Sequence, residues 1–291
     1  MKLATYVHGG RQSYGVVTDR GVADVPAAWP DGPASLLDAI QAGPPATARI
    51  RDIAAAQAAT AIPLADVKLL APIPAPPKLL GLAVNYAEHH REIERGADLP
   101  AEPRRDTTPR PFLMPATAVA HPGDEIPWCD YSRDIDHEVE LAVVIGKGGK
   151  RIPRHQAMEH VAGYTILNDV TARDMQTRDM AASHPWFLSK SFDTFGPLGP
   201  CLTLPDEIPD PHTLELRLTV NGEVRQESNT RNLIFKIPEL IASLSRYITL
   251  EPGDLISTGT PEGISPLQPG DVMEAYVEGI GTLRNPVEEE K

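Results

Sequence analysis

The sequence has little cysteine, no long hydrophobic run and few basic residues. Each of these shortages argues against a class of structure or a kind of partner. Cys129 and Cys201 are its two cysteines, and they form neither a C-x-x-C pair nor a zinc-ligand spacing. They therefore argue against a disulfide framework and favour a reducing, cytoplasmic location. No segment approaches the roughly 20 apolar residues that a membrane-spanning helix needs. The first residues also lack the apolar run of a signal peptide.

The shortage of basic residues gives the chain a strong negative charge. Lys and Arg number 27 against 40 Asp and Glu, which leaves a formal net charge of −13. Such a chain repels nucleic acid and anionic membrane surfaces, so neither is expected as a partner. A small anionic substrate would be repelled too, unless a local positive charge or a bound cation captures it.

What the sequence does contain is typical of a globular protein with many turns. Hydrophobic residues make up 41% of the chain and charged residues 23%, which argues against disorder. The 30 prolines predict short strands and turns instead of long helices. A stiff proline-rich connector at residues 70–78 places a domain boundary near residue 72. We therefore expect a small N-terminal domain at residues 1–72 and a main domain at residues 73–291.

Local patterns predict an α+β fold with one dominant sheet. In the N-terminal part we expect strands at 3–7 and 14–17 and helices at 35–41 and 47–59. In the main part we expect strands at 79–84, 139–145, 161–167, 254–257, 272–277 and 282–287, a hairpin turning at Asn221-Gly222, and a helix at 237–247. Residues 86–95 have helical composition. The polar segment 96–110 is either a functional loop or a disordered insertion.

Three acidic residues alternate along one predicted strand. Side chains of a strand point to opposite faces in turn, so Asp136, Glu138 and Glu140 share a face. Carboxylates stacked beside a buried apolar run are costly unless a positive charge lies among them. A hard divalent cation would supply it. A solvated face with pairing lysines or arginines explains the pattern as well.

A second segment places Asp169 at the exit of a strand, just before a helix. Asp169 is either a third carboxylate ligand or only a local cap, because Thr171 and Asp174 have the spacing of a capping box. Arg173 and Gln176 are three residues apart, so both could reach a bound carboxylate from one helical face.

Four further residues are candidates for chemistry, each with a plain structural alternative. His89 and Glu92 could form a general base held by a carboxylate, or simply join surface ion pairs. Lys190, flanked by aromatic residues, could stabilise an enolate or extend its charge to the surface. Thr260 lies in a glycine-bounded turn that could present its hydroxyl to a ligand.

Taken in order, these segments resemble the fumarylacetoacetate hydrolase family over about residues 79–287. The motifs that carry the resemblance are Asn85-Tyr86-Ala87-Glu88-His89, Glu138-Val139-Glu140-Leu141, Asn168-Asp169-Val170-Thr171-Ala172-Arg173-Asp174, Lys190-Ser191-Phe192-Asp193, Val220-Asn221-Gly222-Glu223, Gly253-Asp254 and Thr258-Gly259-Thr260-Pro261-Glu262-Gly263. Several separate motifs in register are stronger evidence than any one of them.

The resemblance implies a β-rich, mixed β-roll or sandwich catalytic domain behind a small N-terminal domain, and a homodimer. It implies Mg²⁺ or Mn²⁺ held by Glu138, Glu140 and Asp169. His89 and Glu92 match the family's water-activating pair, and the substrate-contact positions match Lys190, Arg173, Gln176 and Thr260. The chain departs from the family at Met114, where members commonly have a lysine.

The implied function is metal-dependent hydrolysis of a carbon–carbon bond in a 2,4-dioxo acid, either an acylpyruvate or a dioxo sugar acid. The products would be pyruvate or a relative, plus a carboxylic acid. Decarboxylation of oxaloacetate and isomerisation of an oxo acid are alternatives that use the same metal site. A catalytically silent homologue that binds a metal or a ligand is a third alternative.

Overall fold

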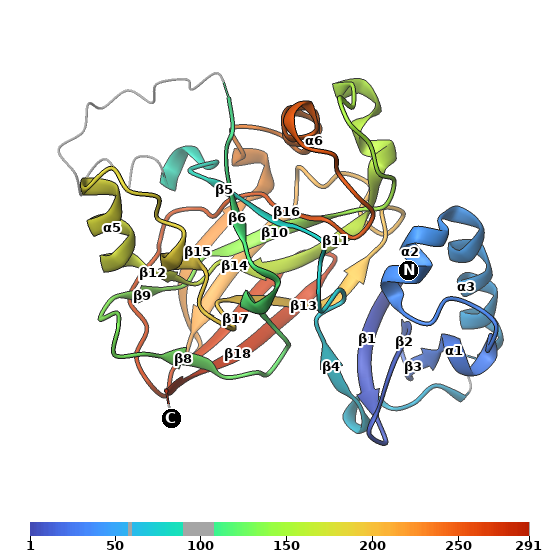
Figure 1. Cartoon of the computed structure of the whole chain (residues 1–291). Coiled ribbons are helices and arrows are strands. Elements are labelled where there is room, and N and C mark those ends of the chain that lie inside the picture. Colours follow the sequence, from blue (N-terminus) through green and yellow to red (C-terminus); the bar gives the residue numbers. More distant parts are fainter. Residues whose placement is uncertain (58–59, 90–107, 291) are drawn as a thin grey trace.

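The described part of the chain folds around two large β-sheets, with helices on the outside and a third, two-stranded sheet (Figure 1). The computed structural model describes residues 1–57, 60–89 and 108–290. An eleven-stranded sheet has the order β3-β2-β1-β13-β11-β10-β16-β5-β6, with β4 paired to β1 and β7 paired to β13. A five-stranded sheet has the order β15-β14-β17-β18-β8. The α+β, β-rich fold expected from the sequence is confirmed.

The N-terminal part contributes one end of the large sheet and the helices that pack on it. Its elements are β1 (Lys2–His8), β2 (Arg11–Thr18), β3 (Gly21–Asp24), α1 (Val25–Ala28), α2 (Leu36–Ala42), α3 (Pro44–Gln57) and β4 (Lys68–Leu70). β1 pairs with β13, with Lys2 opposite Thr203 and Leu3 opposite Leu202. One sheet therefore runs through both parts of the chain, and the division at residue 72 stays a prediction.

The rest of the large sheet comes from the main part of the chain. Its strands are β5 (Leu79–Ala83), β6 (Arg110–Met114), β7 (Val119–Ala120), β10 (Val139–Ile145), β11 (Val161–Asn168), β13 (Gly196–Thr203) and β16 (Leu255–Ser257). β10 is buried along its whole length. It pairs antiparallel with β11, with Val139 opposite Asn168, so the start of β10 lies beside the end of β11.

The smaller sheet and helix α6 close the other side of the core. The strands are β8 (Ile126–Trp128), β14 (Glu215–Val220), β15 (Glu223–Asn229), β17 (Val272–Val277) and β18 (Gly281–Glu289), and α6 spans Ile237–Tyr247. Short elements complete the chain around the site: β9 (Ile135–Asp136), β12 (Thr171–Ala172), α5 (Arg173–Ala181) and the 3₁₀ helix η5 (Leu188–Lys190). Four more 3₁₀ helices in the described part of the chain lie at Leu64–Asp66, Ala116–Ala118, Arg154–His160 and Thr230–Asn232.

The two faces of β10 point into two different cores. Val139, Leu141 and Val143 join the cluster formed with the small sheet and α6. Ala142 and Val144 join a second cluster, which includes side chains of β1, β2, α2 and α3. Because side chains alternate along a strand, Glu140 lies on the same face of β10 as Ala142 and Val144, which pack against the N-terminal part of the chain.

Most predicted elements are present, with shifts of a few residues. The α6 helix and the hairpin of β14 and β15 lie where the sequence predicts them. The expected helix over residues 86–95 is described only at residues 87–89, and the rest of it, like most of the 96–110 loop, lies outside the described residues. Strand β13 was not predicted. No helix in the described part of the chain is both long and apolar enough to cross a membrane.

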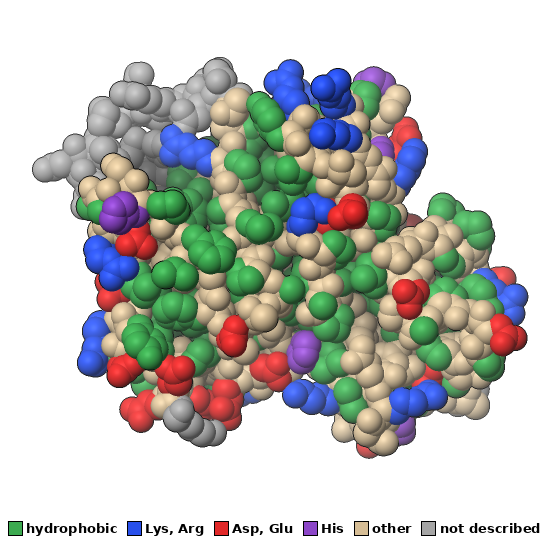
Figure 2. Space-filling model, in the orientation of Figure 1, with side chains coloured by type: hydrophobic (Ala, Val, Ile, Leu, Met, Phe, Trp, Pro, Cys, Tyr) green, Lys and Arg blue, Asp and Glu red, His purple; other side chains and the backbone are tan. Residues whose placement is uncertain are grey.

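Acidic side chains are distributed unevenly over the surface. On the face drawn in Figure 2, acidic side chains gather near the end of β18. Glu288, Glu289 and Glu290 are exposed in that region. The expectation that nucleic acid is not a partner agrees with this charge and stays a prediction.

Candidate metal centre

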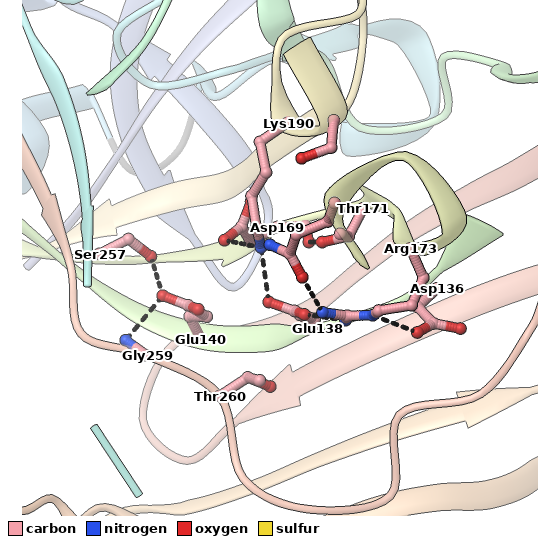
Figure 3. A network of polar contacts seen from close by, with 12 residues as sticks. Asp136, Glu138, Glu140, Asp169, Thr171, Arg173, Lys190, Ser257, Gly259 and Thr260 are labelled. Atoms are coloured by element: carbon pink, nitrogen blue, oxygen red, sulfur yellow. Dashed lines mark hydrogen bonds and ion pairs between the residues drawn. The ribbon is translucent and has the colours of Figure 1, made fainter. Parts of the chain in front are cut away.

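Three buried carboxylates converge where the start of β10 meets the end of β11. Glu138, Glu140 and Asp169 each offer an oxygen, and these oxygens lie within 4.8 Å of one another. The backbone N–H of Asp169 donates to the carbonyl of Glu138 at 2.8 Å. The side chain of Asn168 accepts from the N–H of Glu138 at 2.8 Å. The strand pairing therefore brings together ligands that are distant in the sequence (Figure 3).

Two cations lie against this cluster. The Nζ of Lys190 donates to Glu138 at 2.8 Å and to Asp169 at 2.5 Å. The guanidinium of Arg173 donates through Nε to Asp136 at 2.7 Å and through Nη2 to Glu138. Among the described residues, four buried carboxyl groups, from Asp136, Glu138, Glu140 and Asp169, thus form ion pairs or lie in one cluster with only two cationic side chains.

Glu140 is oriented by the segment that follows β16. Its Oε2 accepts from Ser257 Oγ at 2.5 Å and from the N–H of Gly259 at 2.7 Å. Gly259 has φ +93°, and a Cβ there would lie 2.8 Å from Cβ of Asn85. Only glycine therefore fits a position whose backbone must reach the Glu140 carboxylate.

The three carboxyl groups differ in pKa because their neighbours differ. Burial acts to raise the pKa of Glu138, but the charges of Lys190, Arg173 and His89 outweigh it and lower the value to about 2. Burial raises the pKa of Asp169 to about 6, although Lys190 opposes this. Burial, with the charges of Asp169 and Glu138, raises the pKa of Glu140 well above its usual value. Keeping these buried carboxyl groups ionised therefore costs free energy, and a bound cation would offset part of that cost.

The site fits a hard divalent cation by its charge and by its donor atoms. All three candidate ligands are carboxylates, the donors that Mg²⁺ and Mn²⁺ prefer. Oδ1 of Asp169 is buried without a hydrogen-bond partner among the described residues. A buried acceptor of this kind is costly unless something positive meets it. Glu138, Glu140 and Asp169 could therefore hold such an ion, whose charge would stabilise their ionised forms.

The other predicted site residues lie around this cluster, with one exception. His89 is buried and lies close enough to Glu138 to interact with it electrostatically. Gln176 accepts from Nη1 of Arg173 at 2.5 Å. The hydroxyl of Thr260 is buried and donates to the carbonyl of Val139 at 2.9 Å. Glu92 lies outside the described residues.

Aromatic side chains pack near Lys190, and one of them, Trp186, belongs to the aromatic residues that flank it in the sequence. The Nζ of Lys190 is 5.3 Å from the centre of the Phe112 ring. That ring is tilted against Trp186 at a centroid distance of 5.0 Å. The alternative that Lys190 extends to the surface is wrong, because its side chain is buried among carboxylates.

One local interpretation of the sequence needs correction. Thr171 and Asp174 do not form a capping box: the hydroxyl of Thr171 donates to the carbonyl of Asp169, and α5 has no side-chain cap. Asp174 instead accepts from Ser132 Oγ at 2.6 Å.

Met114 occupies the position where members of the family commonly have a lysine. It is 2% exposed and packs in the second core cluster. An apolar thioether suits that position.

Several contacts that hold the site were not predicted from the sequence. Ser257 and Gly259 fix Glu140, Asn168 fixes the backbone of Glu138, and Gln226 reaches β10 from the other sheet. Asn168 and Gly259 lie in motifs that carry the family resemblance, but Ser257 and Gln226 do not. The sequence signal for these contacts was weak, because the partner of each residue is distant in the chain.

Fold and site together define a class of protein: a β-rich α+β fold that carries a buried carboxylate site suited to a divalent cation. Residues 78–288 match the family described as fumarylacetoacetate (FAA) hydrolase, C-terminal. The chain belongs to the fumarylacetoacetate hydrolase family, as its motifs predict.

Known relatives in this family have different activities. Mitochondrial oxaloacetate tautomerase FAHD2A of Bos taurus is 40% identical over 274 residues, which are 92% of this chain and 84% of the relative. The structure of maleylpyruvate hydrolase from Sphingobium sp. SYK-6, in complex with manganese(II) and pyruvate, is 32% identical with a TM-score of 0.80, and both chains are covered to 100%. The structure of 5-carboxymethyl-2-hydroxymuconate delta-isomerase from Mycobacterium smegmatis is 34% identical with a TM-score of 0.76 and the same coverage.

Proposed function

We propose that this protein is a divalent-metal-dependent enzyme that acts on a small 2-oxo acid through its enolate. The observation that carries the proposal is the convergence of three buried carboxyl groups, with oxygens within 4.8 Å of one another, next to a buried lysine and a buried histidine. A Mg²⁺ or Mn²⁺ ion bound by Glu138, Glu140 and Asp169 would supply a Lewis acid for the oxygens of the oxo acid. It would also offset the repulsion of an anionic substrate by the acidic chain.

We assign Lys190 to charge stabilisation. Burial acts to lower the pKa of Lys190, but Asp169 and Glu138 outweigh it and raise the pKa above its usual value. Lys190 therefore stays protonated, and its fixed charge lies where negative charge develops on an enolate oxygen. Arg173 and Gln176, which contact each other at 2.5 Å, are assigned to binding the substrate carboxylate, and Thr260 to the wall of the substrate site.

We assign proton transfer to His89. In hydrolysis of a 2,4-dioxo acid, His89 takes a proton from water, and the sequence resemblance assigns Glu92 as its partner. The resulting hydroxide attacks the distal carbonyl, and the bond between C3 and C4 breaks. C4 leaves as a carboxylic acid, and the electron pair of the broken bond passes to C3 of the enolate. Protonation at C3 then gives pyruvate or a relative. The likeness to a hydrolase that binds manganese and pyruvate supports this reaction.

A second candidate reaction is keto–enol tautomerisation of oxaloacetate. It is favoured by the 40% identity to an oxaloacetate tautomerase over 92% of this chain. His89 would then move a proton between C3 and the enol oxygen, and no water would attack. Decarboxylation of oxaloacetate and isomerisation of an unsaturated oxo acid would use the same residues.

A substrate panel distinguishes these reactions. Acylpyruvates, dioxo sugar acids and oxaloacetate are followed by ultraviolet absorbance with added Mg²⁺, and the products are identified by chromatography. The proposal expects turnover of at least one substrate that stops when a chelator is added. Turnover that persists in excess chelator, or no turnover of any 2-oxo acid with metal present, would contradict it.

Replacing His89 with Gln tests the proton-transfer role. Hydrolysis should fall by roughly 10²–10⁴-fold, the usual contribution of a general base, while Mn²⁺ binding stays intact. A variant that hydrolyses at the wild-type rate would remove His89 from the mechanism. A variant that loses only its metal would make His89 a structural residue.

We also propose that the protein is a homodimer, in keeping with the sequence resemblance. Large apolar side chains are exposed near the site, on β6, on α5, and on η5 and the residue before it. They are Leu113, Met180, Phe187 and Leu188. Light scattering of the purified protein would show twice the chain mass if these residues are covered by a second copy, and the chain mass if they are not. The cytoplasmic location expected from the sequence remains a proposal, which cell fractionation would test.

A further inference from the structure

Gln226 is a buried amide on an edge strand. It is the fully buried residue of β15, whose other residues are exposed or half-buried. β15 forms an edge of the small sheet, where solvent would normally satisfy a polar side chain. Burying an amide at such a place is costly unless its hydrogen bonds are made within the protein.

The amide of Gln226 makes four hydrogen bonds. Its Oε1 accepts from Nδ1 of His137 at 3.0 Å and from the N–H of Val139 at 3.1 Å. Its Nε2 donates to Oγ1 of Thr260 at 2.9 Å and to the carbonyl of Pro261 at 3.0 Å. The Pro261 carbonyl can only accept, which fixes the orientation of the amide. Because Oε1 can only accept, Nδ1 of His137 must carry a proton.

Gln226 bonds to Val139 beyond the point where the pairing of β10 with β16 ends. β16 pairs with β10 only from Ala142 to Val144, and the next link is the N–H of Thr258, which donates to the carbonyl of Leu141. On this side of β10, no described strand pairs with Val139. Gln226 meets the N–H of Val139 there, and the hydroxyl of Thr260 meets its carbonyl at 2.9 Å. Two side chains thus replace a strand.

The turn that contains Thr260 lies directly on the backbone of β15. Gly263, at the end of this turn, has φ +100°, and a Cβ there would lie 2.1 Å from the carbonyl oxygen of Arg225. Gln226 is therefore held between the turn on one side and β10 on the other. Its position depends on both sheets, which links the small sheet to the strand that carries the carboxylates.

We propose that Gln226 is a positioning residue for the metal centre. Val139 lies between Glu138 and Glu140. Because side chains alternate along a strand, holding the N–H and the carbonyl of Val139 in place keeps both carboxylates on one face and directed at the same point. The inference rests on the proposed function, because it takes these two residues as ligands. Residues that orient metal ligands without touching the metal commonly change its affinity when they are replaced.

The test compares Gln226→Met with a matched control. Met has a similar length but cannot accept or donate these bonds. Ser245→Ala is the control, because buried Ser245 accepts from the N–H of Ile152 at 2.9 Å and is no part of the site. Mn²⁺ affinity, measured by electron paramagnetic resonance, should fall roughly 10–100-fold in the Gln226 variant and stay within about twofold in the control.

A second measurement needs no metal. Exchange of the Val139 amide hydrogen, followed by NMR in metal-free protein, should accelerate at least tenfold more in Gln226→Met than in Ser245→Ala. Wild-type Mn²⁺ affinity in the Gln226 variant, or unchanged Val139 exchange, overturns the inference. If Gln226→Met does not fold, Gln226→Asn is measured instead, since its shorter amide cannot meet the N–H of Val139 and the carbonyl of Pro261 together, and the same limits apply. Absence of Mn²⁺ binding in the wild-type protein would refute the proposed function, whereas Val139 exchange would still decide the role of Gln226.

Discussion

At the scale of single residues, the site is a balance of buried charge. Lys190 contacts Glu138 and Asp169, while Arg173 contacts Asp136 and Glu138. Neither cation contacts Glu140, whose pKa burial raises well above its usual value. A divalent ion near Glu140 would therefore stabilise the part of the cluster that the protein's own cations do not reach.

Replacing Lys190 with Met should destabilise the metal-free protein more than the metal-bound one. Removing one partner of a buried ion pair leaves an uncompensated charge and costs about 3–5 kcal/mol. A bound divalent cation would replace part of the lost charge. Thermal unfolding should thus show a larger rise in Tm with Mn²⁺ for the variant than for the wild type. The control is Lys147→Met, at an exposed lysine, and an equal rise in all three proteins would contradict the account.

The carboxylates could be predicted from the sequence, and their partners could not. Glu138 and Glu140 stand two apart on a strand and Asp169 follows another strand, so their local patterns and the family motifs both point to them. Ser257, by contrast, contacts Glu140 across 117 residues. Nothing in the sequence around a lone serine or glutamine indicates such a partner. The Ser257 contact depends on the pairing of β16 with β10, and the contacts of Gln226 depend on how the two sheets pack.

At the scale of elements, the least predictable strand is a central one. β13 has the sequence GPLGPCLT, and two glycines with two prolines normally predict a turn. It is nonetheless paired with β1 on one side and β11 on the other. The pairing with β11 is irregular between Tyr164 and Ile166, so proline residues without N–H groups are accommodated. Tertiary packing here overrides local preference.

Replacing Gly263 with Ala should destabilise the protein more than replacing Gly270 with Ala. Both glycines have positive φ, +100° and +90°, but a Cβ at Gly270 meets nothing within 4 Å, whereas at Gly263 it meets the Arg225 carbonyl oxygen at 2.1 Å. The backbone cost of about 1–2 kcal/mol is common to both. The clash adds about 1–3 kcal/mol at Gly263. Urea unfolding measures the difference, and equal losses would show that the turn is free to move away from β15.

At the scale of the whole molecule, the N-terminal part and the main part share one sheet and one core cluster. The sequence predicts the proline-rich connector but not the continuity, because the pairing of β1 with β13 joins residues about 200 positions apart, Lys2 and Thr203. His121 helps to hold the connector in place: its Nδ1 accepts from the N–H of Ala71 at 3.1 Å.

Stability should fall in mild acid through His121. Burial lowers the pKa of His121 below its ordinary value of 6.5, with Asp124 opposing and Lys68 supporting the shift. Because the folded pKa is the lower one, the contribution of neutral His121 is complete above about pH 6.5 and is lost as pH falls through the folded pKa. The bond to Ala71 contributes about 1 kcal/mol. His121→Gln keeps an acceptor but cannot titrate, so its unfolding free energy should decline less than that of the wild type between pH 7.5 and pH 5. Parallel declines in the two proteins would contradict this role.

The most direct measurement is calorimetric titration of metal-free protein with Mn²⁺. The account predicts one site per chain in the wild type, and loss of that site when Asp169 is replaced by Asn, which keeps the shape of the side chain and removes its charge. Asp130→Asn, at an exposed carboxylate, should bind as the wild type does. Equal Mn²⁺ binding by Asp169→Asn and the wild type would contradict the claim that these buried carboxylates form a metal centre.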